Sequence, residues 1–190
     1  MKHDKTVSFP ARDALLEAAS KREQSVTKDW DLLHELIDGV EFKEVRHVPK
    51  AGGYVTEVFR RDWGLGHGVV DQVFQVTMEP NQISAWHTHR STTDRIFVSH
   101  GMLKVVLYDG REGSPTQGRV NEFRCGTVRP ALIVIPPQVW HGVQNDSPQQ
   151  ASLLNVVDKA YRYDDPDHWA LPWDTDLIPH RFSTQGRMEL

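Results

Sequence analysis

From residue 42 onward, short stretches of β-branched and aromatic residues are separated by turns rich in Gly, Pro or Asn. Stretches of about four to eight residues with this composition are typical of β-strands. We predict strands at residues 42–48, 54–60, 69–78, 95–99, 103–108, 119–125, 131–135, 141–144 and 152–157. Many short strands in succession predict a closed or folded-over all-β architecture.

The beginning of the chain has a helical pattern instead. Residues 11–19 and 30–37 carry apolar side chains at the spacing of one helix face, and Gly39 follows the second segment as a C-cap. We therefore expect residues 1–40 to be a helical extension whose short helices pack outside a barrel or across a partner subunit.

Beyond residue 158, the chain is rich in aromatic, proline and acidic residues. Because such rings favour packing on a core, we expect residues 159–190 to be a C-terminal tail that wraps a barrel made by residues 41–158. The full length of 190 residues suits one domain with a sizeable core and is short for two.

Charge and hydropathy exclude several classes of protein. The net charge is -4 and no basic stripe is present, which argues against nucleic-acid binding. The longest apolar runs, such as residues 131–135, are far shorter than the roughly 20 residues of a membrane span. The charged N-terminus does not resemble a signal peptide, and Cys125 alone cannot form an internal disulfide. We expect a cytoplasmic protein.

Four residues have side chains that bind divalent metals: His87, His89, Asp94 and His141. Residues two apart on a strand share a face, so His87 and His89 are expected to point the same way, into a barrel if the strand lines one. A carboxylate and a third imidazole from another strand would complete a site for Zn, Fe, Mn or Ni that leaves positions open for water or substrate. The sequence therefore predicts a divalent metal cofactor.

The strings around these residues resemble the two motifs of the cupin superfamily. The first motif, His-x-His followed by an acidic residue and a glycine, matches His87, His89, Asp94 and Gly101, with Asp where Glu is usual. The second motif of Pro, His and Asn matches residues 136–145, with Gln where Gly is usual. The resemblance implies a jelly-roll barrel, also called a double-stranded β-helix.

A narrower resemblance covers the chain from about residue 41 to its end. It is to the dTDP-4-dehydrorhamnose 3,5-epimerase branch of the cupins, and it is carried by residues 53–59, 101–109, 113–118, 135–142 and 165–169 in this order. The resemblance implies a small-molecule substrate such as a sugar or nucleotide sugar, His87 as the catalytic base, and a homodimer.

Four positions depart from the pattern of that branch. Ser84 stands in place of its phosphate-binding Arg, Asp94 in place of its active-site Lys, Asn155 in place of its catalytic Tyr, and Gly52 in place of a further Arg. The fold is therefore implied more strongly than the reaction, since one fold hosts many activities. We expect weak or absent 3,5-epimerase activity on dTDP-4-keto-6-deoxyglucose.

Four side chains are predicted to line the pocket around the ligands. Trp86 and Trp140 each precede a histidine of the motifs, and Ser84 and Asn155 occupy positions where the resembled branch has active-site residues. We expect the two tryptophans to pack or line the pocket and to take no part in the chemistry.

Two roles in proton transfer are open. Asparagine cannot donate a proton as tyrosine does, so the acid would have to be Tyr54, Tyr161 or Tyr163. The resembled branch also keeps an Asp near a Trp of the tail, which orients the catalytic histidine through its other ring nitrogen. Asp174 or Asp176 would fill that role here.

Three functions remain open. The first is a metal-dependent cupin enzyme that isomerises or epimerises a carbohydrate or another small keto or hydroxy compound by removing a proton beside a carbonyl, with oxygenation also possible. The second is a metal-free 3,5-epimerase with His87 as base, which conflicts with the first because a metal-bound nitrogen cannot accept a proton. The third is a non-catalytic sugar-binding barrel. We rank the metal enzyme first, because Asp94 places a negative charge beside two imidazoles.

Overall fold

The computed structural model describes the whole chain except residues 1–11, 22–23, 25, 29–32, 34 and 184–190. The chain divides into two compact units, residues 1–35 and residues 36–190. Within the described residues, no helix is both long enough and apolar enough to cross a membrane.

The helical prediction holds for one of the two N-terminal segments. Helix α1 (Arg12–Glu17) lies inside the predicted segment 11–19. Residues 30–32 and 34 of the predicted segment 30–37 lie outside the described residues, and the remaining residues of the segment, including Ile37 at its end, are not helical. Ile37 is instead 1 % exposed in the barrel core, and its backbone N–H donates to Asn121 Oδ1 over 2.8 Å. Core burial and this side-chain hydrogen bond replace helical hydrogen bonding there.

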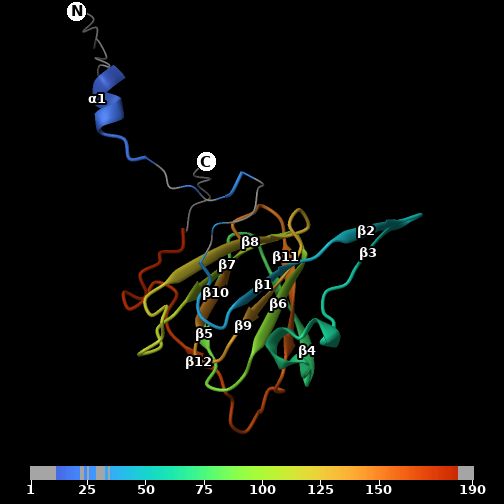
Figure 1. Cartoon of the computed structure of the whole chain (residues 1–190). Coiled ribbons are helices and arrows are strands. Elements are labelled where there is room, and N and C mark those ends of the chain that lie inside the picture. The colour runs from blue at the N-terminus through green and yellow to red at the C-terminus, as the bar shows by residue number, and fades with distance from the viewer. Residues whose placement is uncertain (1–11, 22–23, 25, 29–32, 34, 184–190) are drawn as a thin grey trace, which may run out of the picture. The chain divides into compact units, whose positions relative to one another are not determined.

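Residues 36–183 contain two antiparallel five-stranded sheets, which confirms the predicted all-β cupin jelly roll (Figure 1). The strand order is β1-β9-β6-β11-β4 in the first sheet and β12-β5-β10-β7-β8 in the second. The strands are β1 (Glu41–Glu44), β2 (His47–Lys50), β3 (Gly53–Thr56), β4 (Gln72–Met78), β5 (Ile83–Thr88), β6 (Asp94–His100), β7 (Met102–Tyr108), β8 (Val120–Gly126), β9 (Ala131–Ile135), β10 (Trp140–Gln144), β11 (Ala151–Val157) and β12 (Trp169–Ala170).

The main core lies between the two sheets, because both contribute apolar side chains to it. Ile96 and Ile133 of the first sheet and Leu103 and Phe123 of the second are at most 3 % exposed. Burying apolar surface of this kind stabilises a fold by about 25 cal/mol per Å². The core therefore fixes the two sheets face to face and sets the walls of the space between them.

A second apolar cluster covers the outer face of the second sheet. Trp86 of β5 is fully buried there with Val106 of β7 and with Ile178 and Phe182 of the C-terminal segment. The backbone N–H groups of Trp86 and Leu171 each donate to the carbonyl of the other, over 2.9 and 3.0 Å. The C-terminal segment is therefore both hydrogen-bonded and packed against the strand that carries His87.

The segment between β1 and β4 is less regular than predicted. The expected strand 42–48 is divided, and β2 and β3 form a separate hairpin that extends away from the sheets (Figure 1). Two short 3-10 helices, η1 (Arg61–Trp63) and η2 (Leu65–Gly68), lead from the hairpin to β4.

Candidate active site

Strand pairing brings the motif histidines together. His141 of β10 is the direct cross-strand partner of His87 of β5, and His89 lies one residue beyond the end of β5. Asp94 is the first residue of β6 in the opposite sheet, and the short strand β12 pairs with β5 directly after His168. Residues from both sheets and from the C-terminal segment therefore reach the same space.

This space is a cavity of about 690 Å³ between the two sheets. Its walls are Phe74, Val76 and Leu153 on the apolar side and the imidazoles of the motif on the polar side. The volume lies within the roughly 300–1,000 Å³ of small-molecule sites, and the mixture of apolar walls with a few convergent polar groups is typical of them.

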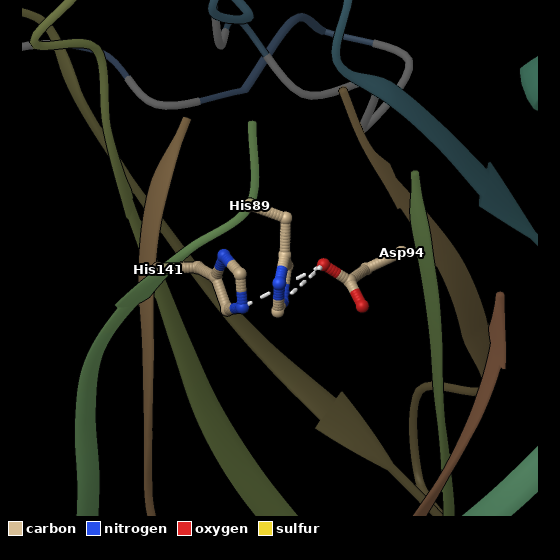
Figure 2. Close-up of side chains that lie close together, drawn as sticks. All are labelled: His89, Asp94 and His141. Atoms are coloured by element: carbon tan, nitrogen blue, oxygen red, sulfur yellow. Dashed lines mark ion pairs between the residues drawn. The ribbon is translucent and has the colours of Figure 1, made fainter. Parts of the chain in front are cut away.

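Three of the four predicted ligands converge on one point, as Figure 2 shows. Asp94 Oδ2 lies 3.3 Å from His89 Nε2 and 3.7 Å from His141 Nε2. One ligand atom from each of the three residues lies within 4.8 Å of the other two. The arrangement offers two nitrogens and one oxygen to a single ion.

The other polar atoms of these side chains are already bonded. His89 Nδ1 donates to the Asp167 carbonyl, and His141 Nδ1 donates to the Val139 carbonyl over 3.2 Å. Asp94 Oδ1 accepts a 2.7 Å hydrogen bond from Asn155 Nδ2. Because a carbonyl only accepts, both histidines carry a hydrogen on Nδ1, so in neutral rings the Nε2 lone pairs face the carboxylate. Lone pairs that face a carboxylate need a proton or a metal cation between them.

Burial keeps the imidazole of His141 neutral. Burial lowers the pKa of His141, and the opposing effect of the Asp94 charge is smaller. A neutral ring is the form that ligates metals, and a ring N–H given to a carbonyl is the usual outer contact of a metal-bound histidine. The donor set therefore fits a divalent cation.

His87 lies beside this group without belonging to it. Its Nε2 is 3.2 Å from Ser84 Oγ, and its Nδ1 is buried with no hydrogen-bond partner among the described residues. Burial, followed by the imidazoles of His141 and His168, lowers the pKa of His87 to about 4. The structure thus separates a neutral His87 from the three residues that surround a common point.

His168 is a further imidazole of the cavity, and the sequence alone did not single it out. Its ring centroid lies 4.8 Å from that of His87 and 5.5 Å from that of His89. Its position depends on the pairing of β12 with β5, which connects segments about eighty residues apart. The one signal in the sequence was its place inside the matched stretch 165–169.

Asp167 joins the C-terminal segment to the loop after β5. Its carboxylate accepts from the backbone N–H groups of Arg90 (2.7 Å) and Ser91 (2.9 Å) and from the hydroxyls of Ser91 and Thr92. Burial acts to raise the pKa of Asp167, but these hydrogen bonds outweigh it and lower the pKa to about 2. Together with the hydrogen bond that the Asp167 backbone carbonyl accepts from His89, these side-chain contacts fix one wall of the cavity.

The two predicted pocket tryptophans do not line the cavity, whereas Ser84 and Asn155 do. Trp86 is buried in the second apolar cluster and Trp140 packs against that cluster. Side chains alternate between the faces of a strand, so the residue before an inward-facing histidine points outward. The prediction that the tryptophans line the pocket was wrong for this reason, and the alternative that they pack against other residues agrees with the structure.

Of the three candidate acids, Tyr161 lines the cavity. Tyr54 lies in the β2–β3 hairpin against His47, and Tyr163 is 90 % exposed; neither lines the cavity.

The two candidate orienting acids also lie elsewhere. Asp174 and Asp176 are exposed, and Asp176 forms an ion pair with Arg181. Asp165 and Asp167 are the acids of the C-terminal segment that line the cavity, and the backbone carbonyl of Asp167 accepts from His89 rather than from His87.

Comparison with known proteins places this geometry in a family. No family model matches the chain. The chain is 32% identical over 139 residues to a probable low-salt glycan biosynthesis epimerase of Haloferax volcanii. The aligned region covers 73% of this chain and 89% of the relative. The chain is also 30% identical over 155 residues to the spore coat polysaccharide biosynthesis protein SpsL of Bacillus subtilis. This aligned region covers 80% of this chain and 100% of the relative.

A solved structure agrees with these relatives. The dTDP sugar isomerase of Desulfovibrio desulfuricans G20 has a TM-score of 0.72 and 32% sequence identity, over 80% of this chain and 94% of that chain. The chain therefore belongs to the cupin-fold family of sugar epimerases and isomerases. It is an epimerase-like enzyme, and the hypothesis of a non-catalytic barrel is set aside.

Proposed function

We propose that this enzyme epimerises or isomerises a sugar. The reaction begins when His87, as the base, takes a proton from a carbon beside a carbonyl. The carbon–hydrogen bond breaks, its proton goes to the imidazole, and its electron pair forms an enolate on the carbonyl oxygen. Return of a proton to carbon gives the product, so the reaction needs no oxidant or reductant. The neutral His87 in a cavity of substrate size is the observation that supports the proposal.

Tyr161 is the acid in this proposal. Its backbone N–H donates to Gln72 Oε1 over 2.9 Å, which holds it beside β4 in the first sheet, whereas His87 belongs to β5 in the second. A base and an acid on opposite walls can remove a proton from one face of a sugar ring and return one to the other. That is the requirement for inversion at carbon.

A divalent metal is the second element of the proposal, with His89, Asp94 and His141 as its ligands and Zn, Fe, Mn or Ni as candidates. Such an ion, when bound, supplies positive charge that stabilises a negatively charged oxygen. Because His87 stands outside the ligand group, it can accept a proton whether or not the metal is present. The conflict between a metal ligand and a base disappears when the two roles fall on different histidines.

The proposed substrate is a nucleotide sugar with a ketone on its ring. A relative at 32% identity is a dTDP sugar isomerase, and the cavity volume suits a ligand of this size. Asn155 stands where the resembled branch has its tyrosine, so we expect weak or absent 3,5-epimerase activity on dTDP-4-keto-6-deoxyglucose and better activity on differently substituted keto sugars.

The test is deuterium incorporation from heavy water into carbons beside the carbonyl, followed by NMR on dTDP-4-keto-6-deoxyglucose and related keto sugars. The His87→Asn variant is expected to lower the exchange rate about 100-fold or more. Tyr161→Phe is expected to keep exchange and lose inversion. The matched control is His100→Asn, which changes an exposed histidine of β6 outside the cavity. Rapid exchange in the His87→Asn variant would overturn the proposal.

A further inference from the structure

The cavity has a cationic edge that the proton-transfer residues do not use. Three long basic side chains line it: Arg90, Lys159 and Arg162. Arg162 forms ion pairs with Asp164 (3.2 Å) and Asp165 (3.7 Å). Arg90 and Lys159 form no ion pair with any carboxylate of the described residues. Two of the three positive charges are therefore available to a ligand.

Arg90 is held in place without being neutralised. Its guanidinium carbon lies 4.0 Å from the centre of the Trp169 ring, while its backbone N–H is bound by Asp167 Oδ1 at 2.7 Å. The Asp167 carboxylate is occupied by four donors of the loop after β5, which leaves the Arg90 guanidinium free of it. A planar guanidinium ordered by stacking loses little entropy when it binds an anion, and its donor geometry matches phosphate oxygens.

Lys159 lies on a loop joined to the one that carries Arg90. The backbone N–H of Thr93 donates to Asp158 Oδ1 over 2.8 Å, so the residue after β11 is tied to the loop between β5 and β6. Lys159 follows Asp158 directly, and both loops border the same cavity. The two unpaired cations thus belong to one edge of the cavity.

We propose that Arg90, assisted by Lys159, forms the phosphate-binding subsite of this enzyme. The inference rests on the proposed function, since it assigns the part of the site that holds the diphosphate of a nucleotide sugar. Ser84 stands where the resembled branch has its phosphate-binding Arg, so in this chain the guanidinium comes from a position six residues further on. The chemical class of the ligand is a nucleoside diphosphate. Weak activity on dTDP-4-keto-6-deoxyglucose would then originate in the proton donor and not in phosphate binding.

The experiment is isothermal titration of the full chain with dTDP, inorganic pyrophosphate and thymidine. Losing a charge-assisted hydrogen bond costs about 1.5–3 kcal/mol, so Arg90→Gln is expected to weaken dTDP and pyrophosphate binding about 10- to 100-fold and to leave thymidine binding unchanged. Arg90→Lys is expected to recover part of the loss, because it keeps the charge without the planar fork. Lys159→Gln is expected to weaken both anions to a smaller extent. Arg162→Gln, which removes a cation already paired, is the matched control and is expected to change little.

Several results would overturn this assignment. They are no binding of dTDP or pyrophosphate by the native chain, equal binding by the native chain and Arg90→Gln, or a larger loss in Arg162→Gln than in Arg90→Gln. Deuterium exchange distinguishes the two proposals. If the chain binds dTDP through Arg90 and yet exchanges no substrate proton, the subsite stands and the proposed function is refuted. If Arg90→Gln leaves the exchange rate unchanged at every substrate concentration, the subsite alone is refuted.

Discussion

At the scale of single residues, two departures from the epimerase pattern depend on each other. The Asn155 side-chain amide donates to Asp94 Oδ1 over 2.7 Å, and its oxygen accepts from the Arg95 backbone N–H at 3.1 Å. Both Asn155 and Asp94 are buried, and a buried carboxylate without partners would be costly. The asparagine therefore both satisfies and orients the carboxylate, leaving Asp94 Oδ2 toward the two histidines. A tyrosine in place of Asn155 has one polar group in its side chain, whereas the bridge between Asp94 and the Arg95 backbone uses two.

His89 belongs to the group of three candidate ligands and His87 does not, so replacing each of them is expected to affect the bound metal differently. We expect the native chain to bind one divalent ion and the His89→Ala variant to lose most of it, while His87→Ala keeps it. In the metal-bound chain, each N or O ligand is expected at about 2.0–2.2 Å if the ion is zinc. Elemental analysis of the purified variants measures this, with circular dichroism to show that the barrel stays folded. Absence of stoichiometric metal from the native chain, or equal loss in both variants, would contradict the three-residue site.

At the scale of elements, the C-terminal segment supports the strand that carries His87. β12 extends the second sheet beside β5, and His180 and Phe182 pack on the Trp86 ring. Because Trp86 points outward where its neighbour His87 points inward, the packing of this segment fixes β5 from behind. The segment thus acts on the site from both sides, through Trp86 on the outer face and through Asp167 in the cavity.

The packing of His180 gives stability a pH dependence. Burial, and then the Lys104 charge, lower the pKa of His180, whereas Glu122 opposes them. The unfolded chain, with an ordinary histidine pKa near 6.5, then binds a proton that the folded chain does not. The free energy of unfolding is expected to be fully retained above about pH 6.5 and to fall as the pH drops below it. His87, His141 and His168 have pKa values lowered in the same direction.

Urea unfolding at pH 7.5, 6 and 5 measures this fall, and the His180→Phe variant isolates one contribution. Phenylalanine keeps a ring against Trp86 and Phe182 and removes a buried Nε2 that has no partner among the described residues. We expect the variant to be at least as stable at pH 7.5 and to lose less stability at pH 5. An identical slope in both proteins would show that His180 does not titrate with unfolding.

At the scale of the whole molecule, apolar surface remains on one sheet edge and on the hairpin. β4 ends the first sheet, with β11 as its one partner among the described strands, and Val73 on it is 54% exposed. Val48 and Val55 of the β2–β3 hairpin are 50% and 51% exposed. Unpaired strand edges and exposed apolar side chains favour association with another chain.

These surfaces support the expectation of a homodimer. Sedimentation equilibrium is expected to give twice the chain mass of 21.7 kDa. A charge placed on the hairpin by Val55→Asp is expected to shift the mass toward the monomer. The control is Val128→Asp, which changes a residue already 86% exposed between β8 and β9. A native chain of monomeric mass at micromolar concentration would rule out the dimer.

Local pattern in the sequence was sufficient for the class of fold and for much of the site. The succession of short β-branched and aromatic stretches predicted an all-β architecture, and the resemblance to the cupins predicted the jelly roll. The His-x-His spacing placed His87 and His89 in the same cavity, because the two-residue period of a strand is a local property. Asp94 and His141, which were predicted as metal ligands, line the same cavity. The same local rule would have turned Trp86 away from the cavity had it been applied to that residue.

Contacts between segments that are distant in the sequence decided which side chains of the site lie close together. Whether His87 joins the ligand group depends on the register of β5 against β10 and on Asp94 from the other sheet. His168, Asp167 and the stacking of Arg90 on Trp169 arise when β12 pairs with β5. The sequence by itself determined which residue types and which strand faces were available, since these follow from neighbours along the chain. Only the tertiary structure decided which of those side chains meet, because pairing between remote strands sets their distances.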